Sequence, residues 1–179
     1  MHLRIPPLLC LALLFAVPAM AQPKKEPPAS HAAAAGAPKE LAKFDDWIAA
    51  THGEGSQLVC YALTRAQNSV PKLSGRGEVV LTVSERATVR DTVAIEAGFD
   101  YAPNAAVTLQ VDQAGLDFYT RHSDAYARDG KAAVAAFQRG ERAIARSPGP
   151  HKETVTDTFS LKGFSAAYAA VVKACPEKK

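Results

Sequence analysis

The chain has 179 residues, of which 47% are hydrophobic and 22% are charged, a balance that suits one globular domain plus extensions. Its formal net charge is +3, and it falls to +2 without residues 1–21, which contain one Arg and no acidic residue. This charge is close to neutral for a nucleic-acid-binding protein, so we expect no nucleic-acid partner.

Residues 1–21 have the layout of a secretory signal peptide. A short basic start precedes an apolar run from Leu8 to Val17, and Ala19-Met20-Ala21 forms a small-x-small cleavage site ahead of Gln22. The apolar run is too short to span a bilayer comfortably. We therefore expect cleavage between Ala21 and Gln22, an exported protein and no stable membrane insertion afterwards. An uncleaved signal that stays as an anchor is the alternative.

Three cysteines occur in the sequence, and the first of them, Cys10, falls within the signal. Lipidation of Cys10 is disfavoured, because the preceding Pro7-Leu8-Leu9 lacks a small residue. In an oxidising compartment the remaining pair, Cys60 and Cys175, is most simply a disulfide, and two separate buried thiols are the alternative. A metal site is disfavoured, because no CxxC or HxxxH motif lies near either cysteine.

The mature chain begins with a Pro- and Ala-rich segment, residues 22–40, that we expect to be a disordered tether, since it has few large apolar groups to bury. We place a single globular domain at residues 41–176 and a charged tail at residues 177–179. The only tryptophan, Trp47, is expected to be an anchor in the core or at a sheet edge.

Short strands with turn residues between them fill the middle of the domain. Alternating or β-branched apolar residues predict these strands at residues 58–63, 78–84, 89–97, 107–111, 116–120, 141–146 and 154–161. The strands at 107–111 and 116–120 form a predicted hairpin, with Gly115 available for a positive φ. In the last strand Asp157 shares a face with Val155 and Phe159.

Two helices are expected in this part of the chain. Residues 132–139 have Val134 and Phe137 three apart after Asp129-Gly130, which predicts a helix of two or three turns. From Gly163 to Cys175 apolar residues recur at helical spacing, so that Phe164 and Tyr168 should be buried and Lys173 exposed. The fold class is therefore mainly β, an antiparallel β-sandwich or barrel-like sheet with one short internal helix and a C-terminal helix.

The sequence contains no recognisable catalytic, cofactor or metal site. Its histidines fall in predicted loops or the tether without ligand spacing, and no serine has a GxSxG context. We expect Asp157 to accept hydrogen bonds from backbone N–H groups near the closing helix, as a structural cap. Phe99, Tyr101 and Arg121 form a possible interaction surface, because aromatic and Arg side chains supply most interface anchors.

Several motifs together resemble the invasion-associated locus B family of small exported bacterial proteins. They are Arg76-Gly77-Glu78, Gly98-Phe99 with Tyr101 and Pro103, Arg139-Gly140, and, most specific, the block of residues 157–167 (DTFSLKGFSAA) that leads to Cys175. The chain departs from the family at Ala125-Tyr126, where an Ala-Trp pair is expected, and at residues 148–151, where a Ser-Arg-Gly-Thr turn is expected. The resemblance implies a periplasmic or secreted protein, a link to host-cell entry in pathogens, and no catalytic residues.

Two functional hypotheses follow. The first is a non-catalytic binding module that contacts an envelope or host protein and needs no cofactor. The alternative is a small periplasmic enzyme, a hydrolase or isomerase, with an unrecognised site, which a deep polar pocket with converging His, Asp or Arg would favour.

Overall fold

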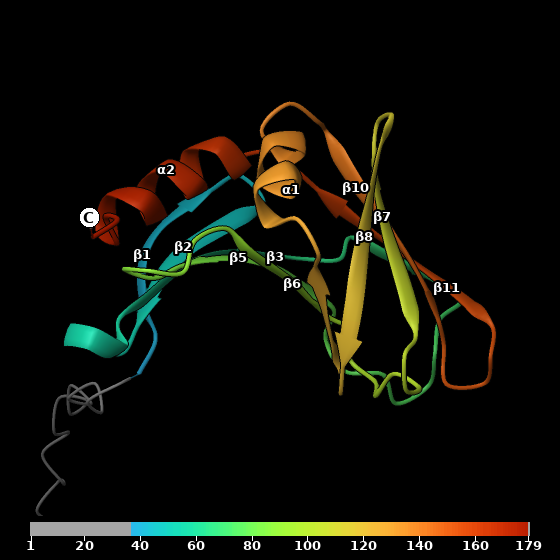
Figure 1. Cartoon of the computed structure of the whole chain (residues 1–179). Helices are drawn as coiled ribbons and strands as arrows, with labels where there is room; N and C mark the ends of the chain where they lie inside the picture. The colour runs from blue at the N-terminus through green and yellow to red at the C-terminus, as the bar shows by residue number, and fades with distance from the viewer. Residues whose placement is uncertain (1–36, 179) are drawn as a thin grey trace, which may run out of the picture. The chain divides into compact units, whose positions relative to one another are not determined.

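The computed structural model describes residues 37–178, which form one antiparallel sheet of 11 strands and two α-helices (Figure 1). The strands are β1 (Lys39–Phe44), β2 (Trp47–His52), β3 (Val59–Arg65), β4 (Asn68–Val70), β5 (Val80–Glu85), β6 (Thr92–Glu96), β7 (Ala106–Val111), β8 (Ala114–Arg121), β9 (Asp124–Ala127), β10 (Arg142–Pro148) and β11 (Thr154–Ser160). The signal peptide, the cleavage site at Ala21 and Gln22, and most of the predicted tether lie outside the described residues. β1 begins at Lys39, ahead of the predicted domain start at Leu41.

The strands follow the order β1-β2-β3-β5-β6-β9-β8-β7-β10-β11-β4 in one continuous sheet. Most neighbours in this order are also close in the chain, as expected for antiparallel strands joined by short turns. The prediction of a mainly β fold with an antiparallel sheet, an internal helix and a C-terminal helix is confirmed. The sheet is open, with β1 and β4 at its edges, and it is strongly curved (Figure 1).

The passage of the chain from β3 into β4 links distant parts of the curved sheet. β3 pairs with β2 and β5, whereas β4 pairs with β11 at the far end of the strand order. Between them, the Ala66 N–H donates to the Val79 carbonyl (2.9 Å) and the Gln67 N–H donates to the Thr158 carbonyl (2.8 Å). One nearly continuous segment therefore brings the far edge of the sheet back to β3.

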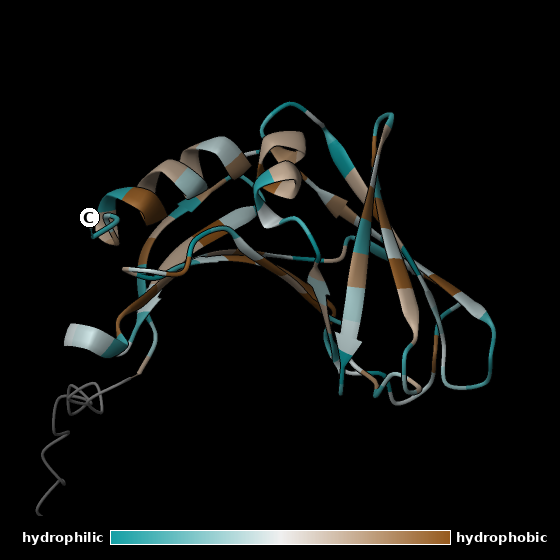
Figure 2. Cartoon of the chain, in the orientation of Figure 1, coloured by the Kyte–Doolittle hydropathy of each residue, from teal (hydrophilic) through white to brown (hydrophobic). Residues whose placement is uncertain are grey.

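One face of the sheet forms the hydrophobic core. Alternate residues in each strand point to this face, so that Leu81 and Val83 of β5 are fully buried, and apolar segments recur along the strands and on the C-terminal helix (Figure 2). Trp47 of β2 is fully buried, and its Nε1–H donates to the Ser160 carbonyl (3.0 Å). The predicted anchor is thus a core residue that joins β2 to the end of β11.

The two helices cover part of this face. α1 (Gly130–Phe137) contacts β6 and β8, and α2 (Phe164–Ala174) contacts β1, β2, β3 and β5. Asp129 caps α1, because its carboxylate accepts a hydrogen bond from the Ala132 N–H (2.9 Å). Gly163 precedes α2 with φ +91°, and a Cβ there would collide with the Phe44 carbonyl. Only glycine therefore fits where the chain turns from β11 into α2.

The prediction from sequence omitted four strands and assigned the positive φ of one turn to the wrong residue. β1, β2, β4 and β9 were not predicted as strands, so the predicted strand at residues 58–63 is the third strand of the fold, β3. In the β7–β8 hairpin the positive φ belongs to Asp112 (49°) and not to Gly115, which is already part of β8. Asp adopts this conformation more readily than most residues do. The turn consists of Asp112 and Gln113 alone, because β8 begins at Ala114 and not at the predicted residue 116.

Candidate functional site

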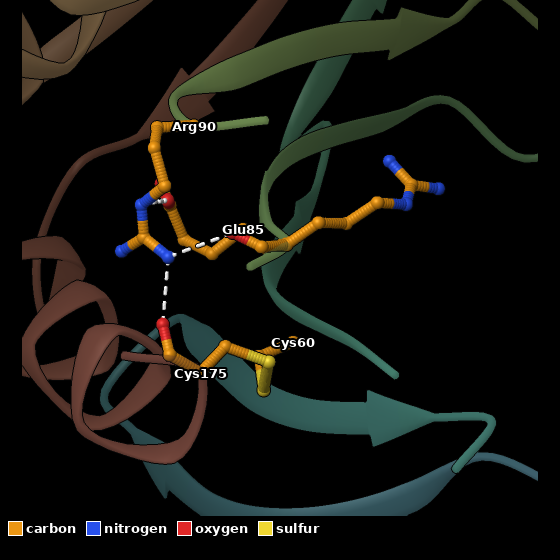
Figure 3. Close-up of a disulfide and its surroundings, with 5 residues drawn as sticks. Cys60, Glu85, Arg90 and Cys175 are labelled. Carbon is orange, nitrogen blue, oxygen red and sulfur yellow. Dashed lines mark hydrogen bonds and ion pairs between the residues drawn. A yellow bond between two sulfur atoms is a disulfide. The ribbon is translucent and has the colours of Figure 1, made fainter. Parts of the chain in front are cut away.

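The predicted disulfide fastens the end of α2 to the sheet. The structure joins Cys60 of β3 to Cys175, the residue after α2, with their Cα atoms 5.8 Å apart across a sequence separation of 115 residues (Figure 3). Arg90 reinforces the attachment, because its Nη1–H donates to the Cys175 carbonyl (2.6 Å). The Tyr168 hydroxyl also donates to the Asp91 carboxylate. Both contacts connect the helix to the turn between β5 and β6.

Replacing both cysteines with Ala is expected to lower the free energy of unfolding by about 2–4 kcal/mol, because a long loop is no longer closed in the unfolded chain. Urea unfolding of the oxidised protein and of the Cys60→Ala/Cys175→Ala variant measures this difference. A reductant should destabilise the parent protein and leave the double variant unchanged. Equal unfolding midpoints for the two oxidised proteins would contradict the prediction.

Glu85 is a fully buried carboxylate beside the disulfide. One of its oxygens accepts from the Asp91 N–H (3.0 Å), and the other lies 2.6 Å from Arg90 Nε (Figure 3). Burial nevertheless outweighs these favourable contacts and raises the pKa of Glu85 from 4.5 to about 7. The folded protein therefore retains a proton on Glu85 at a pH where the unfolded chain has lost it.

This raised pKa predicts that the domain is more stable in mild acid. Between pH 4.5 and about 7 the folded state binds more protons than the unfolded state at this site, so the free energy of unfolding should fall as pH rises through this window. One pKa unit corresponds to about 1.4 kcal/mol, which limits the effect to a few kcal/mol. Urea unfolding across this range should show the slope in the parent protein and a flatter curve in Glu85→Gln. An equally steep curve in the variant would exclude Glu85 as its origin.

Asp157 pairs with Arg76, which corrects its predicted role as a cap that binds backbone N–H groups. Two guanidinium N–H groups of Arg76 donate to the two carboxylate oxygens of Asp157, both at 2.8 Å, and the side chains are only 6% and 4% exposed. The Arg76 Nε–H donates to the Ala97 carbonyl (2.7 Å). Asp157 is therefore already neutralised by a bidentate partner.

Phe99 and Tyr101 belong to the same buried region. Their rings meet edge to face with centroids 5.2 Å apart, and the Arg76 guanidinium lies 5.0 Å from the Phe99 centroid. Both residues are half-buried, and burial raises the pKa of Tyr101 to about 12. Arg121, by contrast, is exposed and pairs in register with Asp124. The structure thus brings Phe99 and Tyr101 together with Arg76 and leaves Arg121 on the outer face of the sheet.

That outer face carries an aromatic and Arg cluster that sequence reasoning missed. Tyr119 of β8 is 46% exposed, and it stacks on Tyr126 of β9, its cross-strand partner, with centroids 5.6 Å apart. The Arg128 guanidinium lies 5.8 Å from the centroid of the Tyr119 ring. The alternation of β8 could have revealed Tyr119, because Phe118 points into the core and its neighbour must point outward.

A groove of about 230 Å³ lies beside this cluster, on the β7 side of Tyr119. We call it the tyrosine groove, and its main lining residues are Asn104, Ala106, Thr108, Asp117, Tyr119 and Arg128. Ala106 is the cross-strand partner of Tyr119, so a small side chain leaves this side of the aromatic ring uncovered. The arrangement offers one aromatic surface with hydrogen-bonding groups around it, which is the composition of a recognition site.

Residues 37–178 contain neither a cluster of metal-ligating side chains nor a helix suited to cross a membrane. No group of three or more His, Cys, Asp or Glu side chains in this part of the chain could hold a metal ion. None of the helices described there is long and apolar enough to cross a membrane.

Comparison with known proteins identifies a family and a protein of similar fold. The sequence model of the family described as invasion associated locus B (IalB) protein matches residues 47–172. The crystal structure of invasion associated protein B from Bartonella henselae is similar in fold, with a TM-score of 0.54 and 19% sequence identity, and the match covers 74% of this chain and 96% of that chain. No curated protein is a significant sequence match.

Proposed function

Because the chain belongs to the invasion associated locus B family of exported bacterial proteins, we propose that it acts in the periplasm or outside the cell as a non-catalytic binding module. Its partner is another component of the bacterial envelope or of a host cell. The observation that carries this proposal is the exposed cluster of Tyr119, Tyr126 and Arg128 on the outer face of the sheet. Tyr and Arg are the residue types most enriched among interface anchors.

The chemistry of the buried polar groups supports the non-catalytic part of the proposal. The two buried carboxylates of the described domain are both engaged, Asp157 by the Arg76 guanidinium and Glu85 by Arg90 and the Asp91 N–H. A general base must be able to reach the proton that it removes from a substrate. These carboxylates instead connect strands and turns within the core, which is a structural role.

The mature chain tests this proposal with a pair of matched surface variants. Tyr119→Ala/Arg128→Ala removes the exposed aromatic and the cation, and capture of the partner from envelope extracts or host-cell surfaces should weaken by at least about tenfold. The control is Tyr61→Ala/Arg65→Ala, which removes the same residue types from the outer face of β3. It should capture the partner as well as the parent does. Equal capture by both variants, or turnover of a substrate that Asp157→Asn abolishes, would contradict the proposal.

A further inference from the structure

Two charged side chains, Asp117 and Arg128, line the tyrosine groove. Ion pairs among residues 37–178 join Arg65 to Glu78, Arg76 to Asp157, Arg90 to Glu85 and Lys162 to Asp45. Neither Asp117 nor Arg128 takes part in any of them, although both line the groove and the Arg128 N–H donates to the Asp117 carbonyl (2.9 Å). The Asp117 carboxylate and the Arg128 guanidinium are therefore free of ion pairs within the described residues, and the guanidinium lies 5.8 Å from the centroid of the Tyr119 ring.

A second groove on the outer face provides an internal comparison. It has a volume of about 310 Å³ and lies over β1, β2 and β3. Three of its four charged side chains contact other protein groups: Asp45 pairs with Lys162 (3.1 Å), Arg65 pairs with Glu78 (2.9 Å) and Asp46 accepts from Gln67 (3.5 Å). The fourth, Lys43, takes part in none of the ion pairs of the described residues. It is larger, but no aromatic side chain lines it, so the tyrosine groove is the better candidate for a ligand that stacks on a ring.

We propose that the tyrosine groove binds a neutral pyranose ring of a glycan, an inference that rests on the proposed binding function and specifies its ligand. The Tyr119 ring provides a flat apolar surface for the C–H face of a sugar, next to the small side chain of Ala106. Asp117 can accept hydrogen bonds from sugar hydroxyls, while Arg128 and Asn104 can donate hydrogen bonds to them. Charged partners make these hydrogen bonds stronger than bonds between neutral groups.

The charge and the size of the groove both favour this ligand. One Asp and one Arg leave the lining without net charge, which disfavours a polyanion and suits a hydroxyl-rich neutral molecule. Pockets for drug-sized ligands span roughly 300–1,000 Å³, whereas this groove has about 230 Å³ and fits one ring with its substituents. A purely apolar partner would leave Asp117 and Arg128 desolvated without compensation.

Titration of the isotope-labelled mature chain with chitotriose and with maltotriose, followed by amide NMR spectra, tests this inference. At least one of these neutral oligosaccharides should shift the amides of Ala106, Thr108, Tyr119 and Arg128 and leave β3 unaffected. Tyr119→Ala should weaken the apparent affinity about threefold to tenfold, the range for loss of one aromatic stacking contact. Asp117→Asn and Arg128→Gln should each weaken it as well, whereas Tyr61→Ala should not.

The outcomes separate this inference from the proposed function. If neither oligosaccharide shifts the groove amides while Tyr119→Ala/Arg128→Ala still loses capture of a protein partner, the glycan inference is wrong and the binding function stands. Equal shifts in the parent and in Tyr119→Ala would also overturn the inference. Tighter binding of the anionic polysaccharide heparin to the same amides would show that the ligand is a polyanion instead. If the groove variants keep both the capture of a protein partner and the binding of saccharides, this face of the sheet is excluded as the site of either activity.

Discussion

Replacing Phe164 with Ala is expected to lower the free energy of unfolding by about 3–5 kcal/mol. Phe164 is the first residue of α2 and is fully buried. Its ring meets Trp47 of β2 at 4.8 Å and Phe137 of α1 at 5.4 Å, both edge to face, and stacks on Tyr168 at 5.6 Å. Truncation therefore leaves a cavity where the sheet and both helices meet, and rigid aromatic neighbours cannot easily fill it.

The matched control for this prediction is Lys173→Ala in the same helix. Lys173 is exposed in the last turn of α2, and its removal should change stability by no more than about 0.5 kcal/mol. Urea unfolding of the two variants beside the parent measures both effects. Similar losses in the two variants would show that α2 is held by something other than its buried face.

The closing helix is the part of the fold that the sequence predicts best. Its apolar residues recur at helical spacing, and the structure buries Phe164, Ala167 and Val171 and exposes Lys173 as expected. Tyr168 is only half-buried, because its hydroxyl reaches Asp91 at the turn between β5 and β6. Periodicity identifies the buried face of a helix, but it does not reveal a polar partner that is distant in sequence.

The missed strands have a physical explanation. β4 and β9 are too short for an alternating pattern to be visible, and β1 is an edge strand whose residues are mostly exposed. β2 contains Trp47, Ala49 and Ala50, and small alanines do not give the β-branched signal used to recognise strands. These strands are specified by the neighbours with which they pair, which is information that local sequence does not contain.

The candidate site was only partly predictable for a similar reason. The sequence grouped Phe99 and Tyr101 with Arg121 as a possible interaction surface, but in the structure both aromatic residues are half-buried, with the Phe99 ring beside Arg76 and the Tyr101 ring against Phe99. Tyr119 lies in a predicted strand, yet its value as a surface residue depends on Tyr126 and Arg128 from the next strand and the segment after it. Strand alternation reveals on which face of the sheet a side chain lies, whereas cross-strand register determines which residues it contacts.

Two of the motifs that carry the family resemblance meet in the folded protein. Arg76 belongs to the Arg-Gly-Glu motif and Asp157 opens the block that leads into α2, 81 positions later, and they form the bidentate ion pair in the core. Gly98, from a third motif, brings the chain close to Gly77, since a Cβ there would lie 2.6 Å from the Gly77 carbonyl oxygen. This close approach places the Ala97 carbonyl within reach of the Arg76 Nε–H.

Replacing Asp157 with Ala is expected to lower the free energy of unfolding by about 3–5 kcal/mol, because the Arg76 guanidinium is then left buried without a counter-ion. Arg76→Ala should have an effect of similar size, since it leaves the carboxylate unpaired and also frees the Ala97 carbonyl. The Arg76→Met/Asp157→Leu double variant removes both charges and keeps apolar volume in the core. It should be closer in stability to the parent than either single Ala variant, as found when buried ion pairs are replaced by apolar residues. Urea unfolding of the parent and the three variants measures these differences in the free energy of unfolding. If the double variant loses as much free energy as the two single Ala variants together, the two side chains act independently and the prediction is wrong.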